Sequence, residues 1–413
     1  MKVVHLNSFE LKGGAAKAAR RLHHGLVEAA VTSRMLVQFK ESDDWRIQGP
    51  VTKAEKAAAL IKDALDPLPK AIYPRGREKV WSINWTPASV ARRIGTLGAD
   101  LVHLHWINAG FVSVESIGRI ARPVVWTLHD MWPLTGGCHY DKGCQRFLEG
   151  CGRCPQLCSS SRHDLSRLGF RRKQRAWRNI RLTLVAPSRW LAGEAGKSPL
   201  FQDRDIRVIA NGLDLDVYKP RERVQARELL GLPGDRPLVL FCAAGDFLDP
   251  RKGGELIRKI LAPLAAWPGD KRPLLAVMGS SEPQAAYPCP LEMLYLGRMH
   301  DDIAIALAYA AADVFLAPSF QDNLPNTVME ALACGTPVAA FRVGGIPEMI
   351  DHGVNGYLAA CGDEAGLGAG VAWLLNHPEP ARLAEAARKT AEQCYDIKRQ
   401  AQCYIELYEE LVR

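Results

Sequence analysis

Short apolar runs alternate with longer helical patterns along the whole chain. In the first half the runs are VVHLN, SRMLVQF, ADLVHLHW, PVVWTLHD and RLTLVAPS. The second half repeats the rhythm with RPLVLFCAA, PLLAVMG, EMLYLGRM, ADVFLAPS and TPVAAF. Continuous apolar strands between helices are typical of parallel sheets that are covered on both faces. The pattern therefore predicts an α/β protein with two doubly wound parallel-sheet domains.

The domain boundary is predicted near residues 191–205. Periodicity fades there into Gly, Ser, Pro and charged residues, just before the apolar run RVIANG. We therefore expect an amino-terminal domain over residues 1–200 and a carboxyl-terminal domain over residues 201–392. The remaining segment, 393–413, is expected to form a helix, because Tyr404, Leu407 and Leu411 fall along one side.

Composition agrees with two globular domains. The chain has 413 residues, of which 47% are hydrophobic and 24% charged, so each domain can bury a sizeable core. No apolar run approaches the roughly 18 residues that a membrane span needs. Residues 1–7 (MKVVHLN) resemble a strand rather than a cleavable signal. These features predict a cytoplasmic protein.

The net charge of +8 is unevenly distributed. Residues 162–181 contain seven arginines and one lysine against a single aspartate, and Arg171, Arg175 and Arg178 would share one helical face. A solvated basic helix is one interpretation, and attraction to anionic lipid head groups at the membrane surface is another. No zinc-finger spacing and no RNA-binding aromatic motif supports a nucleic-acid partner.

The stretch PSFQDNLPNTVMEALACGTPVAA, Pro318–Ala340, reads as the end of a strand, a polar loop and a short helix. Ligands of open α/β sheets bind beyond the carboxyl ends of strands. Asn326 is a plausible helix cap and Gly335 a plausible stop, so free backbone N–H groups would point toward Asn323–Thr327. A helix start of this kind binds anions.

Two carboxylates, Asp322 and Glu330, lie eight residues apart in this stretch. Glycoside hydrolases hold their carboxylates about 5 to 5.5 Å apart when retaining and about 6.5 to 9.5 Å apart when inverting. Eight helical steps of ~1.5 Å would separate these two by about 12 Å. The spacing therefore favours an elongated ligand held at two points, with phosphates at the helix start between them.

The same stretch resembles the carboxyl-terminal signature of glycosyltransferase family 4. That signature has an acidic residue, seven arbitrary residues and a glutamate, followed by Ala-x-Ala-Cys-Gly-x-Pro-Val. Here it reads Asp322, Glu330 and ALACGTPV, with GGIPE at Gly344–Glu348. The first acid is Asp where the family usually has Glu, and NLPN stands where many members have GlyPheGly. The resemblance implies the GT-B fold, in which two Rossmann-like domains face a central cleft and the last helix crosses back to the first domain.

The resemblance also implies which residues hold a nucleotide-diphosphate sugar donor, linked to GDP or UDP. Glu330 would hold the ribose hydroxyls, and Asp322 would hold the sugar ring. Arg251 and Lys252, in the loop DPRKGG after the strand LVLFCAAG, would clamp the diphosphate. Further donor contacts are expected from Gly13, Gly14, Arg298, Asn323, Leu324, Asn326 and Thr327. The two glycines belong to KGGA, a turn that is weak evidence by itself.

His129, in TLHD at a strand end, matches a family histidine that contacts the donor sugar. A lone histidine in such a place often serves only as a structural hydrogen-bonding group. The expected catalytic residues are His129, Arg251, Lys252 and Asp322. His105 and Trp106, which end the preceding strand, are expected on the acceptor side.

Four cysteines, Cys138, Cys144, Cys151 and Cys154, lie in a glycine-rich loop over residues 135–158, directly after the His129 strand. In a cytoplasmic chain such a cluster favours metal over disulfides. Structural zinc, free or redox-active thiols and an iron–sulfur cluster are the open alternatives. Any metal here would be structural, and no catalytic metal is expected.

These observations predict a hexosyltransferase that moves a sugar from the donor to a saccharide acceptor, with the retaining stereochemistry of the family. The NLPNT variant and the cysteine loop resemble bacterial exopolysaccharide, lipopolysaccharide and colanic acid type enzymes. That resemblance implies a lipid-linked acceptor and peripheral contact with the inner face of the cell membrane. A catalytically silent nucleotide-sugar-binding scaffold and a two-domain sugar-nucleotide epimerase are alternatives. No pyridoxal phosphate motif supports a phosphorylase.

Overall fold

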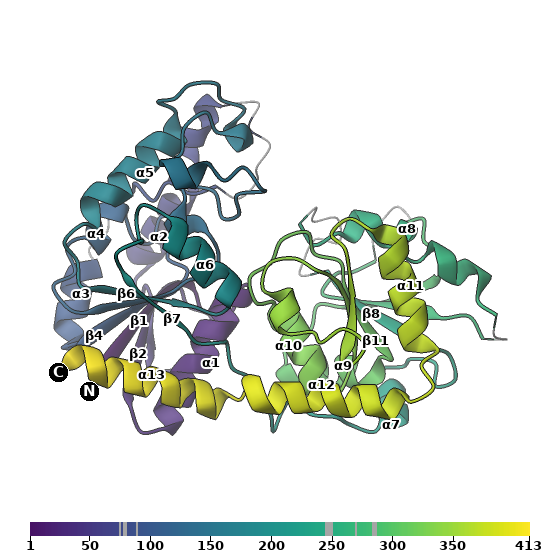
Figure 1. The fold of residues 1–413 in the computed structure, drawn as a ribbon. Helices are drawn as coiled ribbons and strands as arrows, with labels where there is room; N and C mark the ends of the chain where they lie inside the picture. The colour runs from purple at the N-terminus through teal and green to yellow at the C-terminus, as the bar shows by residue number, and fades with distance from the viewer. Residues whose placement is uncertain (74–75, 77–80, 88–89, 244–250, 269–270, 283–286) are drawn as a thin grey trace. The chain divides into compact units, whose positions relative to one another are not determined.

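The computed structural model describes residues 1–73, 76, 81–87, 90–243, 251–268, 271–282 and 287–413. It contains two compact units (Figure 1). Unit 1 is Met1–Ala210 together with Lys398–Arg413, and unit 2 is Asn211–Ile397. Each unit holds one parallel β-sheet, as the apolar pattern predicts. Within the described ranges, no helix is both long enough and apolar enough to cross a bilayer.

Unit 1 has a seven-stranded parallel sheet in the order β3-β2-β1-β4-β5-β6-β7. Its strands are β1 (Lys2–Phe9), β2 (Thr32–Phe39), β3 (Ile47–Gln48), β4 (Leu101–Leu104), β5 (Val124–Thr127), β6 (Leu182–Ala186) and β7 (Asp205–Val208). Its helices are α1 (Gly14–Glu28), α2 (Lys53–Leu65), α3 (Val90–Leu97), α4 (Val114–Ile117), α5 (Leu165–Ala176), α6 (Arg189–Lys197) and α13 (Ile397–Val412).

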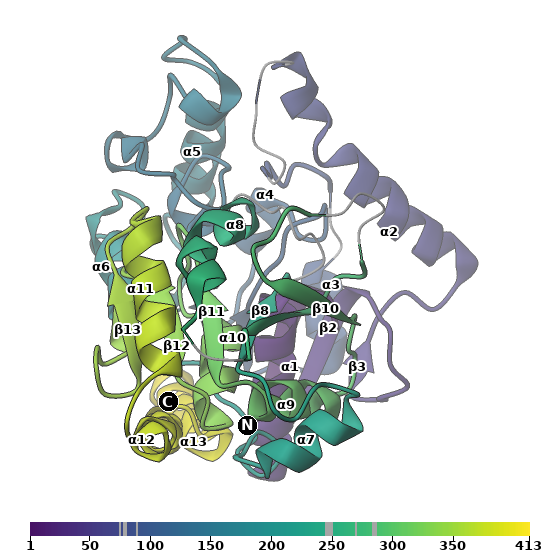
Figure 2. The same ribbon diagram turned by 90° about the vertical axis from the view of Figure 1, so that its right-hand side faces the viewer.

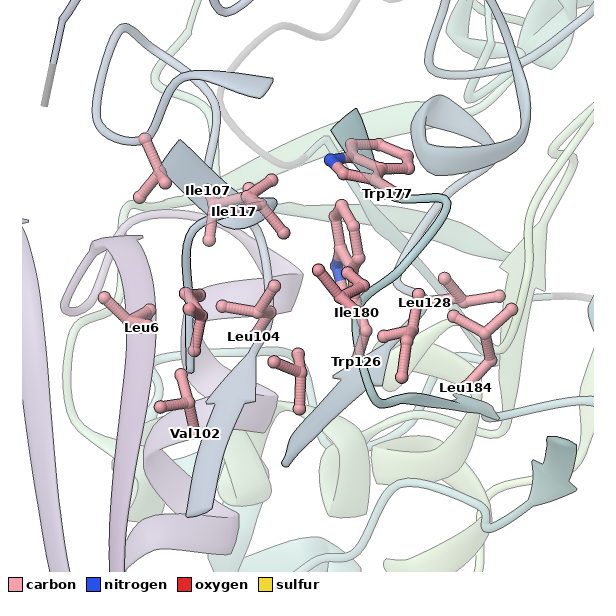
Figure 3. Packing of buried hydrophobic residues seen from close by; sticks show 14 of the residues in the cluster. Leu6, Val102, Leu104, Ile107, Ile117, Trp126, Leu128, Trp177, Ile180 and Leu184 are labelled. Carbon is pink, nitrogen blue, oxygen red and sulfur yellow. The ribbon is translucent and has the colours of Figure 1, made fainter. Parts of the chain in front are cut away.

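Alternate residues of these strands fill two separate cores. On one face, Val102, Leu104 and Trp126 pack with α3, α4 and α6, and Trp177 completes this cluster (Figure 3). On the other face, Val3, Leu101, Val125 and Val185 pack against α1 and α13. The period of two in the strands therefore places His5, His103 and Thr127 on the α1 and α13 face.

Helix α13 is fixed to that face by two tyrosines. Tyr404 and Tyr408 are fully buried. The Tyr404 hydroxyl lies 2.6 Å from Thr127 Oγ1, and the Tyr408 hydroxyl lies 2.6 Å from His103 Nδ1. The carboxyl-terminal segment thus belongs to unit 1, although the 187 residues of unit 2 separate it from the rest of that unit.

Unit 2 has a six-stranded parallel sheet in the order β10-β9-β8-β11-β12-β13. Its strands are β8 (Leu238–Cys242), β9 (Leu274–Met278), β10 (Glu292–Gly297), β11 (Val314–Ala317), β12 (Val338–Phe341) and β13 (Gly356–Ala359). Its helices are α7 (Arg223–Leu229), α8 (Ile257–Ile260), α9 (Asp302–Ala311), α10 (Asn326–Ala333), α11 (Glu364–Leu375) and α12 (Pro380–Cys394). Helices α8 and α11 lie on one face of the sheet (Figure 2). Val371 and Ile260 belong there to one buried cluster with Phe241 and Phe341.

The boundary between the units differs from the one expected after residue 200. The structure places it between Ala210 and Asn211, because β7 pairs with β6 and so extends the first sheet. The last helix begins at Ile397 rather than 393, since α12 runs to Cys394. The pattern also missed β3 and β13, which are short edge strands of two and four residues.

Candidate functional site

A cluster of charged side chains in unit 2 lies where β11 ends. Lys252 Nζ lies 2.6 Å from Asp322 Oδ2, and an Arg251 guanidinium nitrogen lies 3.5 Å from the same oxygen. Asp322 is buried, which by itself would raise the pKa of its carboxyl. The charges of Lys252 and Arg251 and the hydrogen bond from Lys252 outweigh burial and lower that pKa. Three of the predicted site residues are therefore brought together.

The loop that carries Arg251 and Lys252 is fixed against the end of β11. The Phe320 N–H donates to the Arg251 carbonyl oxygen at 2.9 Å. Gly253 has φ of 72°, and a Cβ at this position would lie 2.1 Å from the Pro318 carbonyl oxygen. Only glycine allows so close an approach in this conformation. Asp249 and Pro250, which begin the predicted loop, lie outside the described residues.

A second glycine fixes the backbone of Asp322. Gly344, the first residue of GGIPE, has φ of 54°, and a Cβ there would lie 1.8 Å from the Asp322 carbonyl oxygen. The Gly345 N–H donates to the same oxygen at 3.3 Å. The GGIPE part of the signature therefore holds the β11 loop in place.

Glu330 lies inside α10 and is only 3% exposed. Its Oε2 accepts a hydrogen bond of 3.1 Å from the Tyr309 hydroxyl of α9. Burial and the neighbouring Glu330 charge raise the pKa of Tyr309 well above its usual value, so the tyrosine keeps its proton and donates. The Thr336 hydroxyl donates a 2.7 Å hydrogen bond to the Tyr309 carbonyl oxygen and so helps to fix the Tyr309 backbone.

The start of α10 differs in one detail from the expectation. Pro325 occupies the cap position without a side-chain cap hydrogen bond, and Asn326 is the first helical residue. The Asn326 side chain instead accepts from Asn211 Nδ2 at 3.3 Å. Pro325 has φ of −65°, the value that the proline ring fixes. The helix ends as predicted, with Gly335 at φ of 75°.

Other predicted donor residues lie in different surroundings. Asn323 and Leu324 are buried next to Asp322, and Thr327 is half-buried in the first turn of α10. Arg298 is exposed at the end of the edge strand β10, and β9 and β8 lie between that strand and β11. Arg298 is therefore set apart from the Asp322 cluster.

Gly13 and Gly14 lie at the start of α1 in unit 1. Gly13 has φ of 93° and a Cβ there would meet nothing within 4 Å. Its conformation, rather than crowding, requires glycine. The roles of both residues in donor binding stay predictions.

His129 follows β5 in unit 1 and joins a group of histidines. His105 Nδ1 lies 3.0 Å from His129 Nε2, and His105 Nε2 lies 3.0 Å from His5 Nδ1. His105 is 4% exposed and both of its ring nitrogens are engaged by other histidines. Its ring is thus enclosed by protein, whereas it was expected to line the acceptor side.

Trp106 belongs to a second polar network at the same strand ends. Its indole N–H donates to Asp130 Oδ2 at 3.0 Å. The same carboxylate oxygen lies 2.6 Å from His139 Nδ1, and His139 Nε2 lies 3.1 Å from Ser82 Oγ. Asp130, His139 and Ser82 are all buried. The network positions the backbone that follows His129.

The four predicted cysteines line one small cavity, together with Trp81 and other residues of the loop. All four are free thiols. Burial raises the pKa of Cys138 well above its usual value and the pKa of Cys151 to about 12, and the neighbouring thiols add to the effect on Cys138. The Gly136 N–H donates to Cys151 Sγ at 3.2 Å.

Among the described residues, two groups place all candidate metal-ligand atoms within 4.8 Å of one another. The first group is His5, His103 and His105, and the second is His23, His24 and Asp44. The cysteines are not among these groups, so a shared ion would have to draw their sulfur atoms closer together.

Lys173 lies beside the cysteine loop and is only 1% exposed. It donates to the carbonyl oxygens of Trp132 and Thr135, and its Nζ lies 3.5 Å from the centre of the Trp132 ring. Burial lowers the pKa of Lys173 well below its usual value, while Cys151 and Cys138 act in the opposite direction. One lysine of the arginine-rich run is therefore buried in the interior.

Sequence reasoning missed Tyr309, His5, His139 and Lys173. His5 stands in the apolar run VVHLN, where a polar residue was a visible signal. Its partner is 100 residues away, so the sequence alone does not reveal the contact. Tyr309 and Lys173 lie in helical patterns that give no such signal.

Comparison with known families finds a match for each half of the chain. Residues 12–217 match the family model Glycosyltransferase Family 4, and residues 236–377 match the model Glycosyl transferases group 1.

Curated relatives with similar sequences share one name. D-inositol 3-phosphate glycosyltransferase of Mycolicibacterium paratuberculosis is 33% identical over 304 residues, which are 69% of this chain and 60% of the relative. D-inositol 3-phosphate glycosyltransferase 2 of Catenulispora acidiphila is 32% identical over 200 residues, 45% of this chain and 46% of the relative. The matched part of the chain therefore spans about half of the length of such relatives.

Solved structures resemble the whole chain in fold. Sucrose-phosphate synthase of Thermosynechococcus elongatus has a TM-score of 0.69 and 19% identity, over 100% of this chain and 99% of the other. HepE of Anabaena, solved in complex with UDP-glucose, has a TM-score of 0.66 and 18% identity, over 100% of both chains. At such identities the likeness shows the fold.

Proposed function

Because a family 4 domain is followed by a group 1 domain, the chain belongs to the GT-B glycosyltransferases of family 4, and we propose that it transfers a hexose from a nucleotide-diphosphate sugar to a saccharide acceptor. The proposal includes the retaining stereochemistry of the family. It also includes a lipid-linked acceptor and a role in bacterial surface polysaccharide synthesis.

One observation carries the proposal. Arg251, Lys252 and Asp322 converge where β11 ends, and Glu330 follows within α10. The dipole of α10 adds positive potential at its first turn. Unit 2 by itself thus offers two cations and a helix start for a diphosphate, and a buried carboxylate for hydroxyl groups.

The chemistry follows from this arrangement. The acceptor hydroxyl oxygen would bond to the anomeric carbon while the bond from that carbon to the diphosphate breaks, and the hydroxyl proton would pass to the leaving diphosphate. Negative charge then grows on the leaving diphosphate, where Arg251, Lys252 and the start of α10 would stabilise it. Such a site needs no catalytic metal, so EDTA is expected to leave turnover unchanged.

The first experiment is calorimetric titration with UDP, GDP, ADP and CDP. UDP is the first choice because the similar HepE structure contains UDP-glucose. Lys252→Ala should weaken nucleotide binding by about 10- to 100-fold, the worth of a charge-assisted hydrogen bond. Glu330→Gln, which keeps an acceptor for Tyr309, should weaken it by about tenfold.

Lys259→Ala is the matched control, because Lys259 is an exposed lysine of the same unit and pairs with Glu364. It should bind nucleotide like the wild type. If no nucleotide binds the wild type, the transferase proposal fails. Binding without transfer or hydrolysis of any donor sugar would favour the silent scaffold, and an epimerised donor would favour the epimerase.

The relatives' name suggests a second candidate acceptor, an inositol phosphate. Product analysis with the donor identified above distinguishes it from a lipid-linked saccharide. Transfer to inositol phosphate alone would exclude the surface-polysaccharide role.

Contact with an anionic membrane is proposed for the exposed face of α5. Arg171 and Arg175 are exposed on this helix, and Leu168, one turn before Arg171, is 52% exposed. Arg178 is exposed but lies beyond the end of α5 at Ala176, which corrects the expectation of a single helical face. Basic and apolar side chains together suit an anionic lipid surface.

Cosedimentation with anionic vesicles tests this contact. Replacing Arg171, Arg175 and Arg178 with alanine should abolish binding, whereas replacing Arg258, Lys271 and Arg382, three exposed cations of unit 2, should not. Unchanged binding of the first variant would exclude α5 as the contact.

Structural zinc is proposed for the cysteine loop. Its four thiols surround one cavity, one sulfur already accepts a backbone N–H, and a buried lysine lies beside them. Zinc-bound thiolates carry negative charge, which Lys173 would balance. We expect elemental analysis to find about one zinc ion per chain. The Cys151→Ser variant should lose this zinc. The Cys158→Ser variant should keep it, since Cys158 is exposed. Zinc-free wild type would leave the free-thiol alternative.

A further inference from the structure

Two histidines and one aspartate form a cluster in unit 1, near the point where β2 and β3 begin. His23 and His24 lie in the second half of α1, and Asp44 lies in the loop that leads into β3. One ring nitrogen of each histidine and one carboxylate oxygen of Asp44 lie within 4.8 Å of one another. Ligands of open α/β sheets bind beyond the carboxyl ends of the strands, whereas this cluster lies at the amino ends of β2 and β3.

His23 has one ring nitrogen that protein atoms satisfy and one that they do not. The side chain is fully buried, and its Nδ1 lies 2.7 Å from Ser33 Oγ. Its Nε2 has no hydrogen-bond partner among the residues that the structure describes. Because buried N–H groups without an acceptor are rare, we place the proton on Nδ1 and a lone pair on Nε2. Histidines that bind metals have this arrangement, in which the other ring N–H donates to a nearby oxygen.

His24 and Asp44 supply two further ligand atoms. His24 Nε2 is also buried and lacks a hydrogen-bond partner within the described ranges. It lies 3.5 Å from Asp44 Oδ2. Ligand atoms that surround a tetrahedral zinc ion at about 2.1 Å lie about 3.4 Å from one another, so this separation suits two ligands of one ion. The Arg46 N–H donates to Asp44 Oδ1 at 2.8 Å, which orients the carboxylate and leaves Oδ2 facing His24.

The three groups have the charge states that a metal requires at neutral pH. Burial lowers the pKa of His23 to about 3 and also lowers the pKa of His24, so both imidazoles are neutral. Burial by itself would raise the pKa of Asp44, but the hydrogen bond from the Arg46 N–H and nearby positive charge lower it, so the carboxylate is ionised. Arg20 and Arg46 also lie near His23, and their charges would oppose an ion that the single carboxylate attracts.

We propose that His23, His24 and Asp44 bind one divalent transition-metal ion of the zinc class, with water completing its coordination. Two imidazoles and a carboxylate are ligands that zinc binds in proteins. The side chain of His24 is 42% exposed, so the cluster lies close to solvent, from which the ion and its water can enter. The bound ion would join α1 to the loop before β3 and so stabilise this edge of the first sheet.

The other histidine group, His5, His103 and His105, does not suit an ion in the same way. The two His103 nitrogens lie 2.7 Å from Thr127 Oγ1 and 2.6 Å from the Tyr408 hydroxyl. A divalent cation would have to break these contacts, and the group contains no carboxylate to offset its charge.

The test is equilibrium dialysis of the full chain against micromolar zinc chloride, followed by elemental analysis. We expect the wild type to bind about one zinc ion per chain beyond any held by the cysteine loop. His24→Ala and Asp44→Asn should each bind one ion fewer, and both positions are half-buried, so the fold should survive. Ser33→Ala removes the partner of His23 Nδ1 and should weaken zinc binding by about 10- to 100-fold.

NMR of ¹⁵N-histidine-labelled protein assigns the ion to this cluster. His24→Ala identifies the His24 ring signals by their loss, and zinc should shift these signals in the wild type. The control is His300→Ala, which removes an exposed histidine of unit 2 and should leave the zinc content unchanged.

Equal zinc content in the wild type and His24→Ala would overturn the proposal, and so would His24 signals that zinc leaves in place. Zinc that is lost in Cys151→Ser alone would assign all of the metal to the cysteine loop. Because neither measurement uses a nucleotide, failure of nucleotide binding would leave this result intact.

Discussion

At the scale of single residues, Asp322 has two effects on the cations beside it. It holds Lys252 in place, but its charge also neutralises a group that we expect to meet a diphosphate. Asp322→Asn removes that charge and keeps the shape. We predict about three- to tenfold tighter binding of UDP alone, because two like-charged partners no longer compete for Lys252. Calorimetry measures this, and weaker binding of UDP would contradict it.

Asp66 provides a second prediction for a single residue. Its carboxyl is 3% exposed, and one oxygen has no partner among the described residues. Burial raises its pKa from 3.8 to about 6, although backbone N–H groups of Asn84 and Trp85 lower it in part. The folded state thus binds the proton more tightly than the unfolded state, so its contribution to stability is lost as pH rises through about 6.

Asp66→Asn removes the ionisation. We predict a gain of about 2 kcal/mol in the free energy of unfolding at pH 8, and little change at pH 4. Urea denaturation at both pH values measures it. Equal effects at the two pH values would show that ionisation is not the cause.

At the scale of elements, α13 depends on two hydroxyl groups. Tyr404→Phe and Tyr408→Phe each remove one buried hydrogen bond and leave Thr127 or His103 without that partner. Each change should cost about 1 to 3 kcal/mol in the free energy of unfolding. Tyr357→Phe, at a half-buried position of β13, should cost less than about 0.5 kcal/mol. Similar losses in all three variants would contradict a specific role for these bonds.

The elements themselves could be predicted to a large extent. Every apolar run that we interpreted as a strand is one, because both sheets are parallel and their inner strands are covered on both faces. The edge strand β3 was missed because two residues carry no pattern. The meeting of Lys252 with Asp322, 70 residues apart, came from the family resemblance and not from periodicity. The contacts of His105 with His5 and His129 join residues that are 100 and 24 positions apart, so the sequence alone did not reveal them.

At the scale of the whole molecule, the interior contains a concentration of neutral histidines. His5, His23, His103, His105 and His129 all have a pKa lowered by burial, and all lie in unit 1. Their unfolded pKa is near 6.5, so the unfolded chain binds more protons below that value. The stability that they contribute is complete above pH 6.5 and is lost as pH falls toward about 4, the folded value of His129.

Acid should therefore unfold unit 1 first. Each buried histidine contributes up to ~1.4 kcal/mol per pH unit to the loss. We predict a steep fall in melting temperature between pH 6.5 and pH 5, with hydrogen exchange rising first in β1 and β4. A flat profile over this range, or earlier exchange in the strands of unit 2, would contradict the prediction.

The return of α13 to unit 1 has a consequence for synthesis on the ribosome. Residues 398–413 follow unit 2 in the chain, so the nascent chain must complete all of unit 2 before α13 can cover Val3, Leu101 and Val125. Until then, one apolar face of the first sheet lacks part of its cover and can attract chaperones or other nascent chains. Premature termination anywhere before Tyr404 would make that exposure permanent, which gives the cell's proteases a means of recognising an incomplete chain.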